Sequence, residues 1–479
     1  MRDPSRIARR HFLAAAAAPS LGSLAACTGL GSAAPAQRVQ LVAEPAAAAL
    51  RLPGRDPVAA WTYGGTVPGP EIRAVQGSRL EVDFENRLPV PTTVHWHGLR
   101  VPNAMDGVPH LTQEPVPPGG RFRYSFDLPD AGTYWYHSHL QSAEQVERGL
   151  HGALVVTERQ PPAVDRDLTW VLDDWRLTAA GQLDTNFAAP HDMAHAGRIG
   201  NVVTLNGVLP RDLAVSAGER LRIRLVNAAN ARIFALTFDG HAPLVVALDG
   251  QPVTPHAPAH NRVVLAPGMR ADLILDAAGR PGESHAIGDL FSPRAAYDLL
   301  RLVYGPATRR PQALPPFTAL PANPLPEPDL ARALTHEIRF EGGMMGRLHS
   351  ATLDGKPMNL MGLLRSGKAW ALNGMVASGH EHGHAEAPLL DLPRAQSVRL
   401  LLANDTRWHH PIHLHGHSFR VLARNGLPTP HREWQDTVLM APDERVEIAF
   451  VADNPGRWML HCHVLEHQQG GMMGWFRVA

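Results

Sequence analysis

One unit recurs three times along the chain, and this repetition limits the possible folds more than any other feature. Residues 77–86 (GSRLEVDFEN) match residues 218–227 (GERLRIRLVN), and a third copy at 395–404 (AQSVRLLLAN) lacks only the opening glycine. Each copy begins with alternating apolar and polar residues, which predicts a half-buried β-strand. A unit repeated at this scale predicts repeated domains of one architecture.

A second short element follows each copy. It reads PGGR at 118–121, PGMR at 267–270 and PDER at 442–445, and each time it leads into another alternating strand. The 43 prolines and 42 glycines favour short strands and turns over a helical protein. We therefore predict an all-β chain of three β-sandwich domains. The expected limits are 38–158, 165–305 and 333–479, with 306–332 as a proline-rich linker.

The N-terminal 36 residues are predicted to be a targeting segment outside the fold. Arg9 and Arg10 precede His-Phe-Leu and an alanine-rich apolar stretch, which resembles a twin-arginine export signal. Residues 24–27 (LAAC) resemble a lipoprotein cleavage box, so Cys27 is a possible lipid anchor; cleavage after Ala36 is the alternative. Either route predicts a periplasmic or otherwise exported protein, bound to a membrane only if Cys27 is lipidated.

Charge and cysteine content exclude two further classes. Lys and Arg together number 45, as do Asp and Glu, so a polyanionic partner such as nucleic acid is not expected. Cys27 and Cys462 are the two cysteines, and only Cys462 lies in the folded body, which excludes a structural disulfide there. The 27 histidines and 13 methionines are the unusual feature of the composition.

The histidines are distributed unevenly over the three copies. Domain 3 contains HPIHLHGH at 410–417, and the matching stretch of domain 1 is VHWHG at 94–98. Domain 1 places Thr92 opposite His410. Domain 2 reads FALTFDGH at 234–241 and has no histidine at the three corresponding positions. Domain 2 thus keeps the predicted strand without its candidate metal ligands.

The last strands of domains 1 and 3 show the same pattern. Residues 132–139 (GTYWYHSH) match residues 456–463 (GRWMLHCH), with Ser138 opposite Cys462. Residues i and i+2 of a strand point to the same face. Four His-x-His pairs meeting between domains 1 and 3 are therefore predicted to hold several metal ions. Cys462 points to the other face, where we expect it to meet His410, His467 and Met472, the ligand set of a blue-copper site.

Four motifs in order, HWHG at 95–98, HSH at 137–139, HPIHLHGH at 410–417 and HCHVLEHQQGGM at 461–472, make the chain resemble a three-domain multicopper oxidase of the bacterial laccase and cuprous-oxidase kind. The resemblance implies three cupredoxin-like Greek-key domains and four copper ions. It implies type 2 ligands His95 and His413; type 3 ligands His97, His137, His139, His415, His461 and His463; and type 1 ligands His410, Cys462, His467 and Met472.

The resemblance also implies the reaction. A small reductant gives single electrons at the type 1 copper, through an exposed edge of His410 or His467, and dioxygen is reduced to water at the other three. Asp106 occupies the family's acidic position and is expected to relay protons; a turn aspartate before glycine is the alternative. Gln468 stands where many relatives carry an acid, and an amide cannot exchange a proton as a carboxyl does.

Three functions follow from the resemblance: oxidation of Cu(I) in copper tolerance, laccase-like oxidation of phenols and aromatic amines, or a copper-free envelope scaffold. The complete ligand set disfavours the scaffold. A segment rich in methionine and histidine bears on the choice, because thioether and imidazole bind Cu(I). Its candidate auxiliary ligands are Met344, Met345, His380, His382 and His384, whereas Met358 and Met361 fit core packing.

Overall fold

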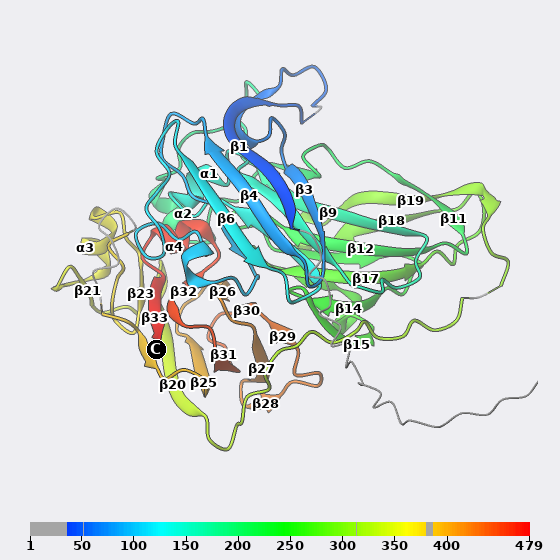
Figure 1. Cartoon of the computed structure of the whole chain (residues 1–479). Helices are drawn as coiled ribbons and strands as arrows, with labels where there is room; N and C mark the ends of the chain where they lie inside the picture. The colour runs from blue at the N-terminus through cyan, green and yellow to red at the C-terminus, as the bar shows by residue number, and fades with distance from the viewer. Residues whose placement is uncertain (1–35, 51, 313, 380–386) are drawn as a thin grey trace, which may run out of the picture. The chain divides into compact units, whose positions relative to one another are not determined.

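The computed structural model describes residues 36–50, 52–312, 314–379 and 387–479. The predicted targeting segment through residue 35 and the histidines at 380, 382 and 384 lie outside these residues. Strands dominate the described chain (Figure 1), which confirms the all-β prediction.

Domain 1 is a sandwich of two four-stranded sheets. One sheet has the order β2-β1-β4-β6, and the other has the order β3-β8-β7-β5. Their core contains Tyr63, Trp96, Tyr124 and Tyr136, all fully buried. The strands are β1 (Gln37–Ala48), β2 (Val58–Tyr63), β3 (Gly69–Val75), β4 (Arg79–Asn86), β5 (His95–His97), β6 (Arg121–Asp127), β7 (Gly132–His137) and β8 (His151–Thr157).

Domain 2 repeats the arrangement with sheets ordered β10-β9-β12-β17-β14-β15 and β11-β19-β18-β13-β16. Apolar side chains of both sheets, such as Ile223, Phe234 and Leu273, fill its core. The strands are β9 (Arg166–Trp175), β10 (Val202–Leu205), β11 (Leu213–Ala217), β12 (Arg220–Asn227), β13 (Phe234–Phe238), β14 (Leu244–Leu248), β15 (Gln251–His256), β16 (Val263–Leu265), β17 (Arg270–Asp276), β18 (Ser284–Asp289) and β19 (Tyr297–Thr308).

Domain 3 contains the sheet β23-β20-β25-β31-β27-β28, in which β29 also pairs with β27, the sheet β24-β33-β32-β26-β30 and the hairpin β21-β22. The strands are β20 (Leu334–Gly342), β21 (Ala351–Leu353), β22 (Lys356–Met358), β23 (Trp370–Leu372), β24 (Leu390–Leu392), β25 (Gln396–Asn404), β26 (His410–Leu414), β27 (Phe419–Arg424), β28 (Leu427–Pro428), β29 (Trp434–Gln435), β30 (Thr437–Met440), β31 (Arg445–Ala452), β32 (Gly456–Cys462) and β33 (Met473–Val478).

The repeated sequence corresponds to a repeated position in the sandwich. The strands β4, β12 and β25 each pair in parallel with the first strand of their domain: β1, β9 and β20, respectively. Each also pairs antiparallel with the strand that follows the second repeated element, namely β6, β17 or β31. The three copies therefore fold alike, which confirms the prediction of three sandwich domains.

Helices are short and occur in connections. They are α1 (Ser142–Gln145), α2 (Pro190–Ala194), α3 (Leu360–Arg365) and α4 (Leu465–Gln469), with 3-10 turns η1 (Asn103–Met105), η2 (Ala259–Asn261) and η3 (Pro293–Ala295). Within the described ranges, no helix has the length and apolar character needed to cross a membrane. The short helices α1 and α4 follow the last histidine pairs of domains 1 and 3, and α4 carries His467.

Candidate metal centres

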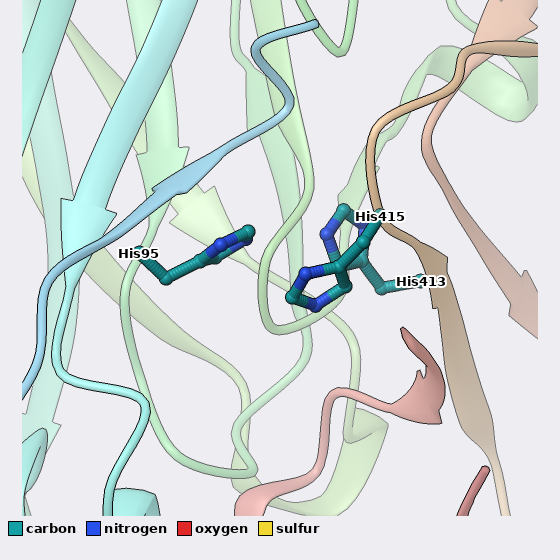
Figure 2. Close-up of side chains that lie close together, drawn as sticks. All are labelled: His95, His413 and His415. Carbon is teal, nitrogen blue, oxygen red and sulfur yellow. The ribbon is translucent and has the colours of Figure 1, made fainter. Parts of the chain in front are cut away.

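Eight histidines from domains 1 and 3 face one another in a single buried cluster. They lie on β5, β7, β26 and β32 or directly after the last three of these strands, and none of the eight residues is more than 1% exposed. Figure 2 shows that His95 approaches from one side and His413 and His415 from the other, and the rings of His95 and His415 stack at 4.0 Å. The rings of His97 and His413 stack at 3.7 Å, and Nε2 of His415 lies 3.0 Å from Nε2 of His461. The structure thus brings the predicted His-x-His pairs together.

In six of the eight rings, one nitrogen is hydrogen-bonded to an acceptor behind the ring. Nδ1 of His95 donates to the carbonyl of Asp106 at 2.7 Å, and Nδ1 of His413 donates to the carbonyl of Asp436 at 2.9 Å. His137 and His461 use Nδ1 to reach the carbonyl of the next residue at 2.9 and 2.8 Å. Such bonds fix the tautomer and orientation of a metal-binding imidazole and aim its other nitrogen at the site.

The nitrogens that face the interior of the cluster are placed to act as metal ligands. Among the described residues, Nε2 of His95, His137 and His413 and Nδ1 of His97 have no hydrogen-bond partner. Buried polar atoms are ordinarily paired, so four unpaired imidazole nitrogens facing one another are the arrangement expected of metal ligands. Burial, together with the neighbouring histidines, holds the pKa values of His97 and His137 well below the usual 6.5, which keeps their lone pairs available. The donor set therefore fits copper.

Asp106 lies at the rim of the cluster, where it ends the turn η1. Its carboxylate accepts from Nδ1 of His415 at 3.0 Å, while its carbonyl accepts from His95. The side chain is 1% exposed. Asp106 therefore contacts histidines of both domains.

A second candidate centre lies on the other face of β32. The ligand atoms of His410, Cys462 and His467 all lie within 4.8 Å of one another. Sγ of Cys462 is 3.4 Å from Nδ1 of His410 and 3.6 Å from Nδ1 of His467. Met472 is fully buried in the same apolar cluster as Cys462, and its carbonyl accepts from the Cys462 N–H. Burial raises the pKa of the Cys462 thiol, so without a metal the group stays protonated.

The prediction that His410 or His467 has an exposed edge is wrong. His410 and His467 are both fully buried. Nε2 of His467 donates to the carbonyl of His195 at 2.7 Å, just beyond α2, and Nε2 of His410 bonds to Oγ1 of Thr406 at 2.8 Å. A backbone carbonyl from domain 2 thus covers the edge of His467. The motif spacing within domain 3 could not predict that contact.

The candidate auxiliary ligands are only partly described. Met344 packs against the core of domain 3, and its N–H and carbonyl bond to Ala194 and to Nε1 of Trp408. Met345 is 67% exposed. Of the two methionines expected in the core, Met358 is partly buried, but Met361 is 58% exposed on α3, so that expectation is wrong for Met361. The segment therefore offers an exposed thioether close to α2.

Gln468 is buried beside the second centre. Its side chain is 2% exposed, and neither amide atom has a hydrogen-bond partner among the described residues. It lines a pocket of about 220 Å³ with Leu140, Ser142 and Lys368. A carboxyl is therefore missing at this position, as the sequence indicated.

Sequence reasoning missed the residues behind the cluster. Oδ1 of Asp436 accepts from Nε2 of His97 at 3.2 Å, and Oγ1 of Thr437 lies 3.1 Å from the same nitrogen. Arg270 of domain 2 pairs with Asp436 through two bonds of 2.8 and 2.6 Å. Asp436 has no motif spacing that marks it, but Arg270 occupies the last position of the repeated element at 267–270.

Comparison with known proteins identifies the same family in each of the three domains. Residues 47–161, 166–287 and 354–479 match three family models, each described as multicopper oxidase. Multicopper oxidase MmcO of Mycobacterium tuberculosis is 30% identical, covering 98% of this chain and 96% of that protein.

Solved structures show the same similarity. A multicopper oxidase from Pseudomonas thermotolerans is 35% identical with a TM-score of 0.81, covering 93% of this chain and 100% of that one. One from Campylobacter jejuni, described as a metallo-oxidase, is 26% identical with a TM-score of 0.75, covering 92% of this chain and 91% of that one.

Proposed function

The chain belongs to the multicopper oxidase family, and we propose that it oxidises Cu(I) in copper tolerance, with dioxygen as the final electron acceptor. The proposed cofactor is four copper ions, held by the residues of the two centres. We assign type 2 to His95 and His413; type 3 to His97, His137, His139, His415, His461 and His463; and type 1 to His410, Cys462, His467 and Met472.

The chain itself connects the two centres. Copper, when bound, supplies the one-electron chemistry and the reduction of dioxygen to water. Cys462 lies between His461 and His463 at the end of β32. The backbone therefore joins the centre of His410, Cys462 and His467 directly to the histidine cluster. His461 and His463 are buried, and the side chains packed around them keep bulk water from the cluster. Substrate oxidation and oxygen reduction are thereby held apart.

The covered edge of His467 carries the proposal for a metal-ion reductant. Because the His195 carbonyl accepts from Nε2 of His467, a bulky aromatic cannot lie against that ring without displacing the segment after α2. Around this cover are His191, whose side chain is 80% exposed and whose ring stacks on that of His195, and the exposed Met345. Imidazole and thioether groups suit Cu(I).

A laccase-like activity is the second candidate, favoured by a separate observation. A pocket of about 450 Å³ between domains 2 and 3 is lined by Phe291, Tyr297, Trp408 and His409. Its aromatic walls suit a phenol or an aromatic amine, and His409 directly precedes His410. A non-enzymatic scaffold role has no such support, since the donor set of both centres is complete.

Proton delivery is proposed to depend on Asp106. Its carboxylate contacts His415 at 3.0 Å, within reach of protons entering the cluster. The amide of Gln468 cannot exchange a proton as a carboxyl does, so we assign the relay to Asp106. Asp106→Asn should slow reoxidation by dioxygen far more than reduction of the blue centre, in rapid-mixing measurements.

We further propose export through the twin-arginine route, with the protein working in the periplasm or attached through Cys27. The motif at Arg9 and Arg10 supports export, and the sequence at residues 24–27 supports the attached form. Mass determination of the mature N-terminus would separate cleavage after Ala36 from lipidation of Cys27.

The reductant is tested by comparing Cu(I) with a phenol on one copper-loaded preparation. Met344→Leu with Met345→Leu, combined with deletion of residues 378–385, should slow Cu(I) oxidation and spare or improve phenol oxidation. Met361→Leu, which changes another exposed methionine on α3, serves as the control. Phe291→Ala should slow only phenol oxidation. Equal loss of both activities in the methionine variant would reject the Cu(I) proposal.

A further inference from the structure

One arginine position of the threefold repeat differs between the domains in its surroundings. Arg121 and Arg445, which end the element in domains 1 and 3, have side chains 76% and 46% exposed. Each pairs with a surface acid, an interaction that contributes little to stability. Arg270, at the same position in domain 2, is completely buried. A guanidinium is costly to bury, so its retention there needs a specific explanation.

Arg270 joins all three domains. Its Nε donates to the carbonyl of Thr133 in domain 1 at 3.2 Å, and Nη1 donates to the carbonyl of Gly268 in domain 2 at 3.1 Å. Both terminal nitrogens bond to the carboxylate of Asp436 in domain 3, at 2.8 and 2.6 Å. This two-pronged contact fixes the plane of the Asp436 carboxylate.

A second acid of domain 2 completes the support. Asp249, in the turn between β14 and β15, accepts from the N–H of Arg270 at 2.9 Å. Its other oxygen accepts from the N–H groups of Asp436 and Thr437 at 3.2 and 3.0 Å. Domain 2 therefore holds both the side chain and the backbone of Asp436.

Asp436 transmits this support to two cluster histidines. Its carboxylate accepts from Nε2 of His97, and its carbonyl accepts from Nδ1 of His413 at 2.9 Å. Thr437 lies between them, since its Oγ1 is 3.1 Å from nitrogens of both rings. The rings of His97 and His413 are thereby set parallel, with an interplanar angle of 14°.

Two glycines leave room for this arrangement. At Gly98, which follows His97 with a φ of +85°, a Cβ would lie 2.1 Å from Nη2 of Arg270 and 2.5 Å from Oδ2 of Asp436. At Gly268 a Cβ would lie 2.8 Å from the ring of His463. The element at 267–270 thus forms part of the cluster wall, although domain 2 has none of the histidine ligands.

We propose that Arg270 is a positioning residue for the histidine cluster: with Asp249, it holds Asp436 so that His97 and His413 present their free nitrogens to copper. This inference rests on the proposed copper assignment but not on the identity of the reductant. Domain 2 is then part of the metal site, through a buried ion pair, despite its loss of ligands.

Arg270→Lys tests the proposal, because an ammonium cannot reproduce the two-pronged contact. We expect copper retention at the cluster, measured by chelator competition, to weaken about 10- to 100-fold. The electron paramagnetic resonance spectrum of the non-blue copper should change, while the thiolate-to-copper absorbance of the Cys462 centre stays as in the wild type. Asp249→Asn should act in the same direction, and it provides a second test if Arg270→Lys does not fold.

Arg121→Lys and Arg445→Lys are the matched controls, since they change the same repeat position on the surface. Both should leave copper retention and spectra unchanged. If Arg270→Lys and Asp249→Asn lower only the unfolding temperature and leave the retention and spectrum of the non-blue copper unaltered, the ion pair is structural and the proposal is overturned. A wild-type protein that binds no cluster copper would instead reject the copper assignment itself, and this inference with it.

Discussion

The same pocket exists twice in the molecule, once in domain 1 and once in domain 3. The Ser138 N–H donates to the Leu150 carbonyl at 3.1 Å, and the Cys462 N–H donates to the Met472 carbonyl at 3.1 Å. Thr92 lies opposite Ser138 as His410 lies opposite Cys462. The backbone of one pocket therefore repeats that of the other.

The side chains make the two pockets chemically different. In domain 1, the hydroxyls of Thr92 and Ser138 donate to Oε1 of Gln145 at 2.7 and 2.6 Å, which closes a polar triad. In domain 3, Nδ1 of His410 and Nδ1 of His467 lie 3.1 Å apart and point at one spot beside the thiol. The polar groups of the domain 1 triad hydrogen-bond to one another, whereas the donor atoms of His410, Cys462 and His467 are arranged to share a metal ion. The fold supplies the pocket, and the donor set decides its chemistry.

Cys462→Ser should have the largest effect, because a hydroxyl is a poor ligand for a soft metal. We expect complete loss of the thiolate absorbance and of substrate oxidation. The fold should persist, since Ser138 occupies the same backbone position in domain 1. Absorbance spectroscopy and oxygen uptake measure the loss, with circular dichroism as the check on folding. A blue and active serine variant would contradict the type 1 assignment.

Acid should destabilise the copper-free protein through His410 and His467 of domain 3. The polar triad of domain 1 has no group that titrates in this range. Burial lowers the pKa of His467 to about 3, so below about pH 6.5 the unfolded chain binds the proton first. This stability is thus complete well above pH 6.5 and falls as the pH drops through 6.5, by up to about 1.4 kcal/mol per pH unit for each such histidine.

The variant His410→Thr, Cys462→Ser, His467→Gln copies the domain 1 triad and sharpens this comparison. Between pH 6.5 and 5 it should lose about 3 kcal/mol less stability than the copper-free wild type, since two histidines are removed. Urea unfolding at several pH values measures the difference. Identical pH slopes in the two proteins would show that these histidines do not titrate on unfolding.

Met472→Leu should give a smaller change, because domain 1 already has a leucine, Leu150, at this place. The blue centre should remain, with a higher reduction potential, since the loss of a weak axial donor disfavours Cu(II) more than Cu(I). Stability should change by less than about 1.5 kcal/mol. Redox titration measures the potential, and a fall would count against Met472 as the axial ligand.

Ser138→Ala should have the smallest effect. It removes one hydroxyl from the triad but leaves Oε1 of Gln145 bonded to Thr92, so we expect a loss of about 1 kcal/mol in the free energy of unfolding. Copper content and thiolate absorbance should not change. A loss of copper would show that the domain 1 pocket contributes to the metal sites after all.

The parts of this structure that sequence could predict depend on local rules. The period of two in the repeats predicted the strands, and the His-x-His spacing predicted which rings share a face. The opposite orientation of Cys462 followed from the same alternation. These inferences needed only the geometry of a single strand, which is the same in every sandwich.

The parts that sequence could not predict depend on contacts between distant segments. The carbonyl that covers His467 belongs to His195, 272 positions away, and a backbone carbonyl has no residue type to reveal it. The burial of Arg270 depends on how domain 2 packs against domains 1 and 3. Two arginines at the same repeat position are exposed, so the motif alone could not distinguish the three.

The division of the cluster between two domains also sets an order of events during maturation. Half of the histidines come from domain 1 and half from domain 3, and contacts such as that between His97 and Asp436 join positions 339 residues apart. Neither domain alone offers a complete site, so the cluster can be loaded only after both have folded and docked. An incomplete chain that lacks either domain therefore cannot assemble the cluster.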